Sequence, residues 1–141
     1  MTLVELRLRT RRYVRDTLIK RFSETEIDAY LNEGVDRLRS YYMFVDMPYI
    51  NTTDDISYLP IPYHYALALY ASSRCFGVDN DFYQEEEKRN EFENIFADLV
   101  TEIENGRIII LDATDTAVVD AYEADYVTEE YFDTTSDEVT I

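Results

Sequence analysis

The apolar residues of the chain recur at helical spacing in four segments, and the second segment has the clearest pattern. Its apolar positions follow at steps of four, four and three, which is the spacing of one helical face: Ile27, Leu31, Val35 and Leu38. The motif SETE, residues 23–26, precedes them and predicts a capping box. Gly34 costs this helix about 1 kcal/mol relative to alanine, which indicates close approach by another element.

The first helix is predicted to be amphipathic, with a basic face. TLVE, residues 2–5, is a second capping box. At 100° per residue one arc holds the apolar side chains Leu3, Leu6, Tyr13, Val14 and Leu18. The arginines lie along its margin or on the far side: Arg7, Arg9, Arg11, Arg12 and Arg15. We expect these five to contact a neighbouring subunit or another partner.

Other interpretations of this basic face stay open. It is a docking surface for nucleic acid or for an acidic partner, or a solvated face that forms salt bridges with the protein's own acidic fourth helix. In an assembly of subunits side by side, it meets the acidic face of the neighbour.

The third and fourth helices are predicted from residue 62 onward. Pro62 suits the first turn of YHYALALYASSRCF, which is apolar on nearly every side, so we expect a central, buried helix that Gly77 ends. The fourth begins near Asp81, with Gln84 three residues on, and Gly106 ends it. One face of this helix is apolar: Phe92, Ile95, Phe96, Leu99 and Ile103.

Between the second and third helices the pattern changes. Two short strands, 49–52 and 56–59, could pair around 53–55 as a β-hairpin, with an extended segment as the alternative. RIIIL, residues 107–111, is a β-prone run. The fold class is therefore mainly α: a four-helix bundle in 1–106, then an extended strand and an acidic C-terminal arm in 107–141.

Charge is distributed unevenly along the 141 residues. The chain has 13 basic and 30 acidic residues, a net charge of −17. Residues 1–22 carry seven basic and two acidic side chains, net +5, whereas 106–141 carry one arginine and ten acids, net −9. This polarity indicates that the two ends meet different neighbours. The overall charge argues against sequence-reading DNA binding, which needs a broad basic footprint.

Candidate catalytic chemistry is sparse. His64 and Cys75 are the only histidine and cysteine, and eleven residues on one helix separate them by about 16 Å. Zinc sites need more such ligands. Asp79 begins a motif like a calcium loop, but Gln84 stands where the loop needs glycine, and Asn90 where it needs glutamate. The three glycines lie too far apart for a phosphate loop. We predict a non-enzyme with no catalytic residues, no metal site and no cofactor.

The single cysteine excludes an internal disulfide and favours folding in a reducing cytoplasm. No apolar run approaches the roughly 20 residues of a membrane span. We therefore expect a soluble intracellular product without a membrane partner.

Four segments in order resemble the head-tail connector, or adaptor, proteins of long-tailed bacteriophages: TLVELRLRTRRYVRD, FSETEIDAYLNEGVDRLRSYY, YLPIPYHYALALYASSRCF and DFYQEEEKRNEFENIFADLVTEI. The resemblance covers roughly residues 2–105. Its marks are an arginine-rich first helix, an FS-x-x-E-I-x-x-Y-L-N start to the second, an extended segment ending in LP-x-P, and an Ala- and Tyr-rich third helix before a charged fourth.

The resemblance implies a structural virion protein in the neck between head and tail, present in the host cytoplasm during assembly. It implies a homo-oligomeric ring, typically a dodecamer, that extends the DNA channel between the capsid portal and the tail or stopper. The expected partners are the portal protein, a stopper or tail-completion protein and further copies of the chain. Genomic DNA passes through without sequence-specific binding.

The acidic tail, residues 120–141, also carries aromatic side chains that a purely solvating tail does not need. We expect Tyr122, Tyr126, Tyr131 and Phe132 to dock the tail as an arm on a portal or next-ring surface, with permanent disorder as the alternative. The rival function is an acidic DNA mimic or inhibitor that binds a nucleic-acid-binding enzyme. The five arginines of the first helix are unexplained by that function.

Overall fold

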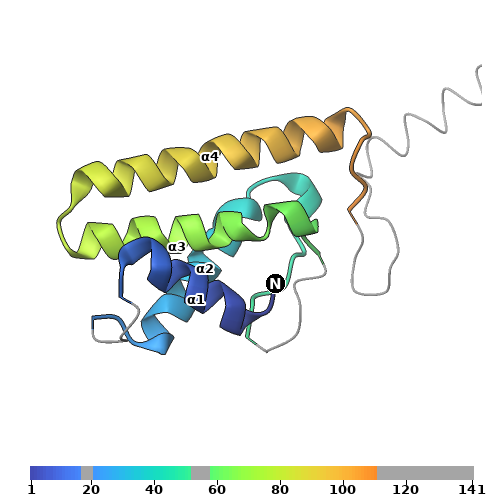
Figure 1. Ribbon diagram of the computed structural model, residues 1–141. Helices are drawn as coiled ribbons and strands as arrows, with labels where there is room; N and C mark the ends of the chain where they lie inside the picture. Colours follow the sequence, from blue (N-terminus) through green and yellow to red (C-terminus); the bar gives the residue numbers. More distant parts are fainter. Residues whose placement is uncertain (17–20, 52–57, 111–141) are drawn as a thin grey trace, which may run out of the picture.

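The computed structural model describes residues 1–16, 21–51 and 58–110, and these form a helical bundle without a strand (Figure 1). Its elements are α1 (Leu3–Val14), α2 (Glu24–Leu38), η1 (Tyr42–Phe44), η2 (Ile61–Tyr63), α3 (Tyr65–Val78) and α4 (Phe82–Glu104). The prediction of a mainly helical fold with four α-helices is confirmed.

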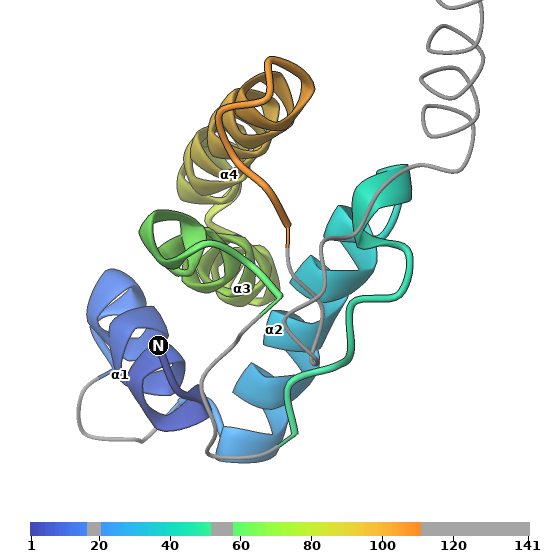
Figure 2. The same ribbon diagram turned by 90° about the vertical axis from the view of Figure 1, so that its right-hand side faces the viewer.

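Helix α3 is the central element, as its apolar pattern predicted. It packs against each of the other three α-helices. Viewed end-on, α4 covers one side of α3, and α1 and α2 cover the other (Figure 2). Its side chains are buried on several sides, including Leu67, Leu69, Ala71 and Cys75. The α3 helix therefore separates α1 from α4.

Gly34 marks the place where α2 crosses α3. A Cβ atom at this position would lie 3.1 Å from Leu67 Cδ2 and 3.3 Å from Tyr70 Cβ, both on α3. The close approach predicted from the glycine is confirmed. Because even a methyl group would press on α3, the absence of a side chain sets the distance between the two helices.

The starts of three helices are where the capping motifs placed them. Thr2 Oγ1 accepts a hydrogen bond from the Glu5 amide at 3.2 Å, and Ser23 Oγ accepts one from the Glu26 amide at 3.1 Å. Each glutamate returns a bond to the backbone of its cap, so both capping boxes are complete. At α4, Asp81 Oδ1 accepts from the Gln84 amide at 3.2 Å.

Helix ends were predicted less well. Helix α1 ends at Val14, because Arg15 adopts a left-handed backbone conformation with φ 60°, and the predicted apolar position Leu18 lies outside the described residues. Helix α3 does not end at Gly77 but continues to Val78, and the chain reverses at Asn80, φ 62°. Gly77 instead lies beneath the Glu85 carboxylate, where a Cβ would come within 3.0 Å of Cδ.

The predicted hairpin is not seen in the described part of its segment, residues 49–51 and 58–59, which contains no strand. Residues 52–57 lie outside the described residues. At Ile50 the backbone is paired with a side chain: its N–H donates to Asn32 Oδ1 at 2.7 Å, and its carbonyl accepts from Asn32 Nδ2 at 3.0 Å. The amide of an α2 side chain thus takes the place of a partner strand.

Residues 107–110 also form no strand, but they belong to the core. Ile110 is 1% exposed within the core cluster, and Ile108 is partly buried against it. The packed body thus extends beyond Gly106, the predicted end of the helical domain. The acidic arm and its four aromatic residues lie outside the described residues.

Candidate interaction surface

Two of the five candidate arginines of α1 are engaged within the protein. Arg7 donates from Nε and Nη2 to the Asp28 carboxylate at 2.7 and 2.6 Å, and its Nη1 lies 2.8 Å from Glu24 Oε2. The hydrogen bonds that Arg7 donates to Asp28 raise the pKa of Arg7 above its ordinary value. Arg7 therefore fastens α1 to α2.

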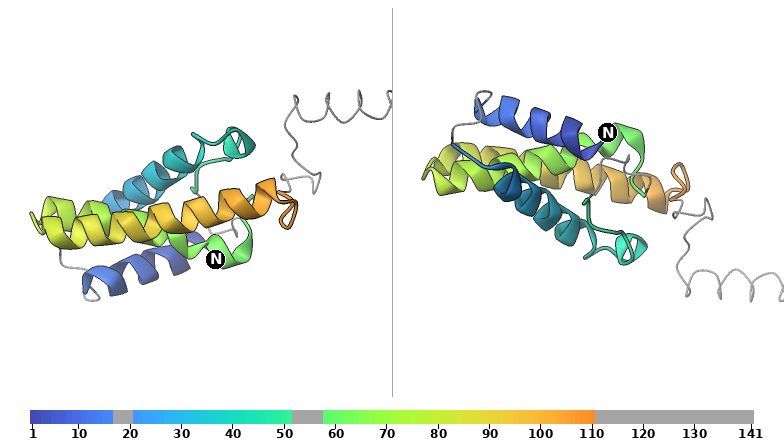
Figure 3. Two further views of the ribbon diagram at one scale, coloured as in Figure 1. Left: turned by 90° about the horizontal axis from the view of Figure 1, so that it is seen from above. Right: turned by 90° about the horizontal axis from the view of Figure 1, so that it is seen from below.

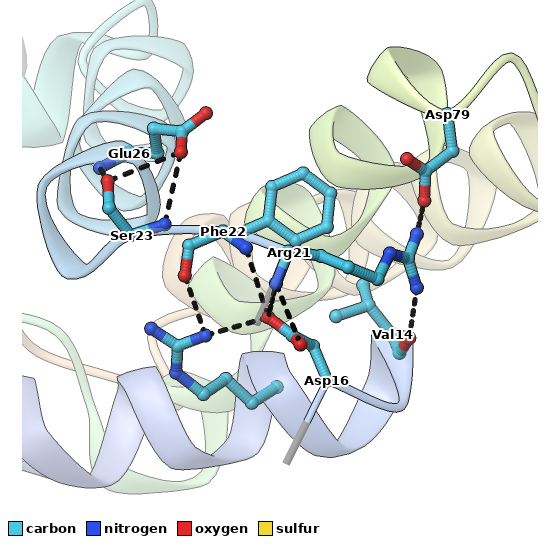
Figure 4. A network of polar contacts seen from close by, with 8 residues as sticks. Val14, Asp16, Arg21, Phe22, Ser23, Glu26 and Asp79 are labelled. Carbon is cyan, nitrogen blue, oxygen red and sulfur yellow. Dashed lines mark hydrogen bonds and ion pairs between the residues drawn. The ribbon is translucent and has the colours of Figure 1, made fainter. Parts of the chain in front are cut away.

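Arg11 is the second engaged arginine, and it is 3% exposed. Its Nη1 donates to Asp16 Oδ2 and to the Phe22 carbonyl, each at 2.9 Å (Figure 4). Asp16 also accepts from the backbone amides of Arg21, at 3.1 Å, and Phe22, at 3.1 Å. This buried ion pair holds the chain that leaves α1 against the chain that enters α2.

The other three candidates remain available to a partner. Arg12 and Arg15 are exposed and Arg9 is half-buried, and none of them has an ion pair within the part of the chain that the structure describes. Val4 and Leu8, 45% and 51% exposed, lie on the same outward side of α1. We call Val4, Leu8, Arg9, Arg12 and Arg15 the α1 outer face.

The outward side of α4 carries the opposite charge. Its exposed positions include Glu86, Glu87, Glu91 and Asp98, which we call the acidic α4 face. Seen from above and below, α1 runs along the flank of the bundle while α4 lies across the other side of α3 (Figure 3). In the described chain no α1 arginine pairs with an α4 carboxylate. The alternative of internal α1–α4 salt bridges is therefore not observed among these residues.

A surface pocket of about 530 Å³ lies where α1 and α3 end and α4 begins. Tyr13, Val14 and Phe76 are among its lining residues, together with the cations Arg15, Arg21 and Lys88. We call it the terminal pocket. Sequence reasoning did not assign Arg21 or Lys88 to a site, because their approach to α1 depends on the turn between α3 and α4.

The three cations of the terminal pocket differ in whether a carboxylate pairs with them. The Arg21 guanidinium pairs with Asp79, which also lines the pocket. The Lys88 ammonium lies 5.2 Å from the centre of the Tyr13 ring and 3.5 Å from Glu91 Oε1. Arg15 has no such partner among the described residues. The lining therefore combines three apolar or aromatic side chains with six polar or charged ones, among which three cations outnumber the carboxylates of Asp79 and Asp81.

His64 and Cys75 are placed as structural residues. His64 is 2% exposed, with Nδ1 2.6 Å from the Met1 amino group and Nε2 2.6 Å from the Leu59 carbonyl. A carbonyl only accepts, so Nε2 carries the proton and Nδ1 accepts from the amino group. His64 thereby joins the N-terminus to the segment that enters α3.

We expect Cys75 to be unreactive in the folded protein. Its side chain is fully buried, and burial raises the pKa of the thiol from 9.0 to about 12. Because the thiolate is the nucleophile, a thiol-reactive dye at pH 8 should label Cys75 slowly in buffer and rapidly in denaturant. The Ala97→Cys variant, with an exposed thiol on α4, serves as the fast control. Equally fast labelling of Cys75 in buffer would contradict the prediction.

Across residues 1–16, 21–51 and 58–110, no three His, Cys, Asp or Glu side chains are arranged to hold a metal ion. None of the described helices is both long and apolar enough to cross a membrane.

Comparisons with known proteins give no relative. No family model matches the chain, and neither a curated protein nor a solved structure matches it. Its class is thus defined by the fold and surface alone: a helical bundle with a basic outer helix and an acidic outer helix on opposite sides of a central one.

Proposed function

We propose that the chain is a structural subunit of an oligomeric ring in the neck of a bacteriophage particle, between the capsid portal and the tail or stopper. The observation that carries this proposal is the placement of opposite charge on opposite sides of the bundle. Arg9, Arg12 and Arg15 face outward from α1, and the acidic α4 face lies beyond α3.

Such a molecule is complementary to a second copy of itself. When two different faces of one subunit meet, the contact repeats from copy to copy, and it closes into a ring if the rotation allows. Two of the five α1 arginines are occupied by internal ion pairs, so the proposed contact uses the remaining three. The acidic α4 face of the neighbouring subunit is the surface that they meet.

The net charge is consistent with a channel for DNA. A ring of about twelve copies, the number that the connector resemblance implies, would carry roughly 12 × −17, or −204. A wall of the same sign as phosphate repels the duplex and lets it pass without binding. The acidic arm, with Tyr122, Tyr126, Tyr131 and Phe132, is proposed as a further attachment point, and an extended segment or hairpin at 49–59 as an additional loop of the subunit.

Imaging tests the ring directly. The purified chain mixed with the portal protein is examined by electron microscopy and native mass spectrometry, and a ring bound to the portal is expected. Arg9→Glu with Arg12→Glu should abolish the ring, while Arg107→Glu, a charge reversal at an exposed residue away from α1, should not. Restoration of the ring by adding Glu86→Arg and Glu87→Arg would identify α1 and α4 as the contacting faces. A chain that stays monomeric with portal at all concentrations would contradict the proposal.

The second candidate function is an acidic DNA mimic that inhibits a nucleic-acid-binding enzyme. The acidic α4 face favours it, because a row of exposed carboxylates resembles a phosphate backbone. This function does not explain Arg9, Arg12 and Arg15, which have no ion pair among the described residues. Stable capture by a DNA-binding enzyme, without a portal-dependent ring, would favour this function over the connector.

A further inference from the structure

The terminal pocket is bordered by apolar side chains that the bundle leaves exposed. Phe82 is 63% exposed and Tyr83 75%, and both stand between two lining residues, Asp81 and Gln84. Val78, at the end of α3, is 53% exposed. Large apolar side chains grouped beside a pocket mark an interaction site more often than scattered ones do.

The charge of this region favours an acidic occupant. The lining holds the cations Arg15, Arg21 and Lys88 and the carboxylates Asp79 and Asp81, a net charge of +1. Arg21 is paired with Asp79, and Lys88 contacts Glu91 at 3.5 Å. Arg15 has no ion-pair partner in the described chain, and Arg12 lies one turn before it on α1. A lining that joins apolar side chains to a net positive charge fits a peptide in which aromatic and acidic residues are neighbours.

The chain itself contains such a peptide in residues 120–133, DAYEADYVTEEYFD. Tyr122 precedes a glutamate, Tyr126 follows an aspartate, and Glu130, Tyr131, Phe132 and Asp133 are consecutive. The segment has no basic residue, so its carboxylates have no partner within it. Its aromatic side chains match the apolar residues of the terminal pocket, and its carboxylates match the excess of cations there.

The position of the pocket favours a second copy as the source of this segment. The described chain ends at Ile110, six residues after α4 ends at Glu104, whereas the pocket's lining residues Asp81, Gln84 and Lys88 belong to the N-terminal end of α4. Helix α4 has 23 residues and so spans about 34 Å. The ten residues 111–120 reach at most about 36 Å when fully extended. Reaching its own pocket would demand a nearly straight path from the first part of the segment.

We infer that the terminal pocket binds residues 120–133 of a second copy of the chain, with Tyr122 in the pocket and carboxylates on Arg15 and Lys88. The inference rests on the proposed ring, because it supplies a second link between the copies. It also assigns the acidic arm to another copy of the chain rather than to the portal or a different ring.

Cross-linking between isotopically distinct copies tests the inference. Full-length chains with benzoylphenylalanine in place of Tyr122, the aromatic residue to which the limited reach of residues 111–120 applies, are prepared with ¹⁴N and ¹⁵N, mixed, assembled and irradiated. Cross-linked peptides that join the two isotopes and connect the tail to residues 13–16 or 76–88 are expected. Lys88→Glu, which leaves the three α1 arginines of the proposed ring contact unchanged, should reduce their yield about tenfold, since the reversal replaces attraction with repulsion, whereas Arg107→Glu should leave the yield unchanged.

Two results would overturn the inference. Cross-links only within one isotope would place the segment on its own chain, and mixed links that map away from the pocket, including to added portal protein, would assign it another surface. Rings that persist without the expected links would refute the inference and leave the proposed function standing. Absence of rings at every concentration would count against the proposed function instead.

A second measurement guards against variants that fail to fold. A fluorescent peptide of residues 120–133 is titrated with a full-length chain whose Tyr122, Tyr126, Tyr131 and Phe132 are serine, so that its own tail does not compete. Saturable binding that weakens about tenfold or more in the Arg15→Glu background supports the pocket. Binding that is insensitive to Arg15→Glu while circular dichroism shows an intact fold contradicts it.

Discussion

Replacement of Asp16 with asparagine is expected to lower the free energy of unfolding by about 3–5 kcal/mol, because it leaves the Arg11 guanidinium buried without its counter-charge. The side chains of Arg11 and Asp16 are 4% and 3% exposed, so water does not screen the loss. Urea denaturation followed by circular dichroism measures the change.

The size of this effect follows from how many groups depend on one carboxylate. The Asp16 carboxylate accepts hydrogen bonds from the Arg11 guanidinium and from the amides of Arg21 and Phe22. Phe22 is itself 3% exposed in the core. Buried donors that lose their acceptor cost about 1–3 kcal/mol, and more when charged. Asparagine preserves the shape of the side chain but weakens all of these bonds.

A matched control and a double variant show whether the loss comes from the buried ion pair. Asp98→Asn makes the same chemical change at an exposed position of α4 and should alter stability by no more than about 0.5 kcal/mol. Arg11→Met combined with Asp16→Asn should be less destabilised than the sum of the two single changes, because neither charge is left unpaired. A loss below about 1 kcal/mol in Asp16→Asn would show that the pair is not needed to join α1 and α2.

Replacement of Phe92 with alanine is the second large effect expected, a loss of about 3–5 kcal/mol. Phe92 is fully buried at the interface of α4 with α3. Its ring centre lies 5.2 Å from that of Tyr70, edge-on, and 6.1 Å from that of Phe96. Truncation leaves a cavity that these rings cannot refill without moving the helices.

The control for this change is Phe82→Ala on the same helix. Phe82 is 63% exposed, so its removal should change stability by no more than about 0.5 kcal/mol. Thermal and urea unfolding of both variants, compared with the parent chain, measure the difference. Similar losses in the two would mean that the α3–α4 interface does not stabilise the bundle in the way the packing indicates.

Local chemistry predicted the helices better than it predicted their ends. A capping box needs only residues three apart, so Thr2 and Ser23 could be recognised from the sequence. The end of α1 depends on a left-handed arginine, and the reversal after α3 depends on a left-handed asparagine rather than on Gly77. Arginine carries no signal for this conformation, whereas asparagine adopts it more readily than other non-glycine residues, so Asn80 was a signal that the prediction based on Gly77 missed.

The candidate surface was predictable only in part, for a related reason. Periodicity placed all five arginines at the margin or on the far side of the first helix. Residues farther along the chain decide which of these arginines a partner can reach. Arg7 donates hydrogen bonds to Asp28, and Arg11 donates one to the Phe22 carbonyl. The terminal pocket depends on α4 meeting α1, which no local pattern encodes.

Arg15 has a backbone conformation that lowers stability and a cationic side chain that serves the proposed contact with another copy. A non-glycine residue with φ 60° carries a conformational cost of about 1 kcal/mol, so the backbone alone would favour glycine there. The chain instead places a long cationic side chain at this turn, beside the pocket. Arg15→Gly would therefore relax the turn while removing the charge, so under the proposed function a variant selected only for heat resistance would fold well and assemble poorly.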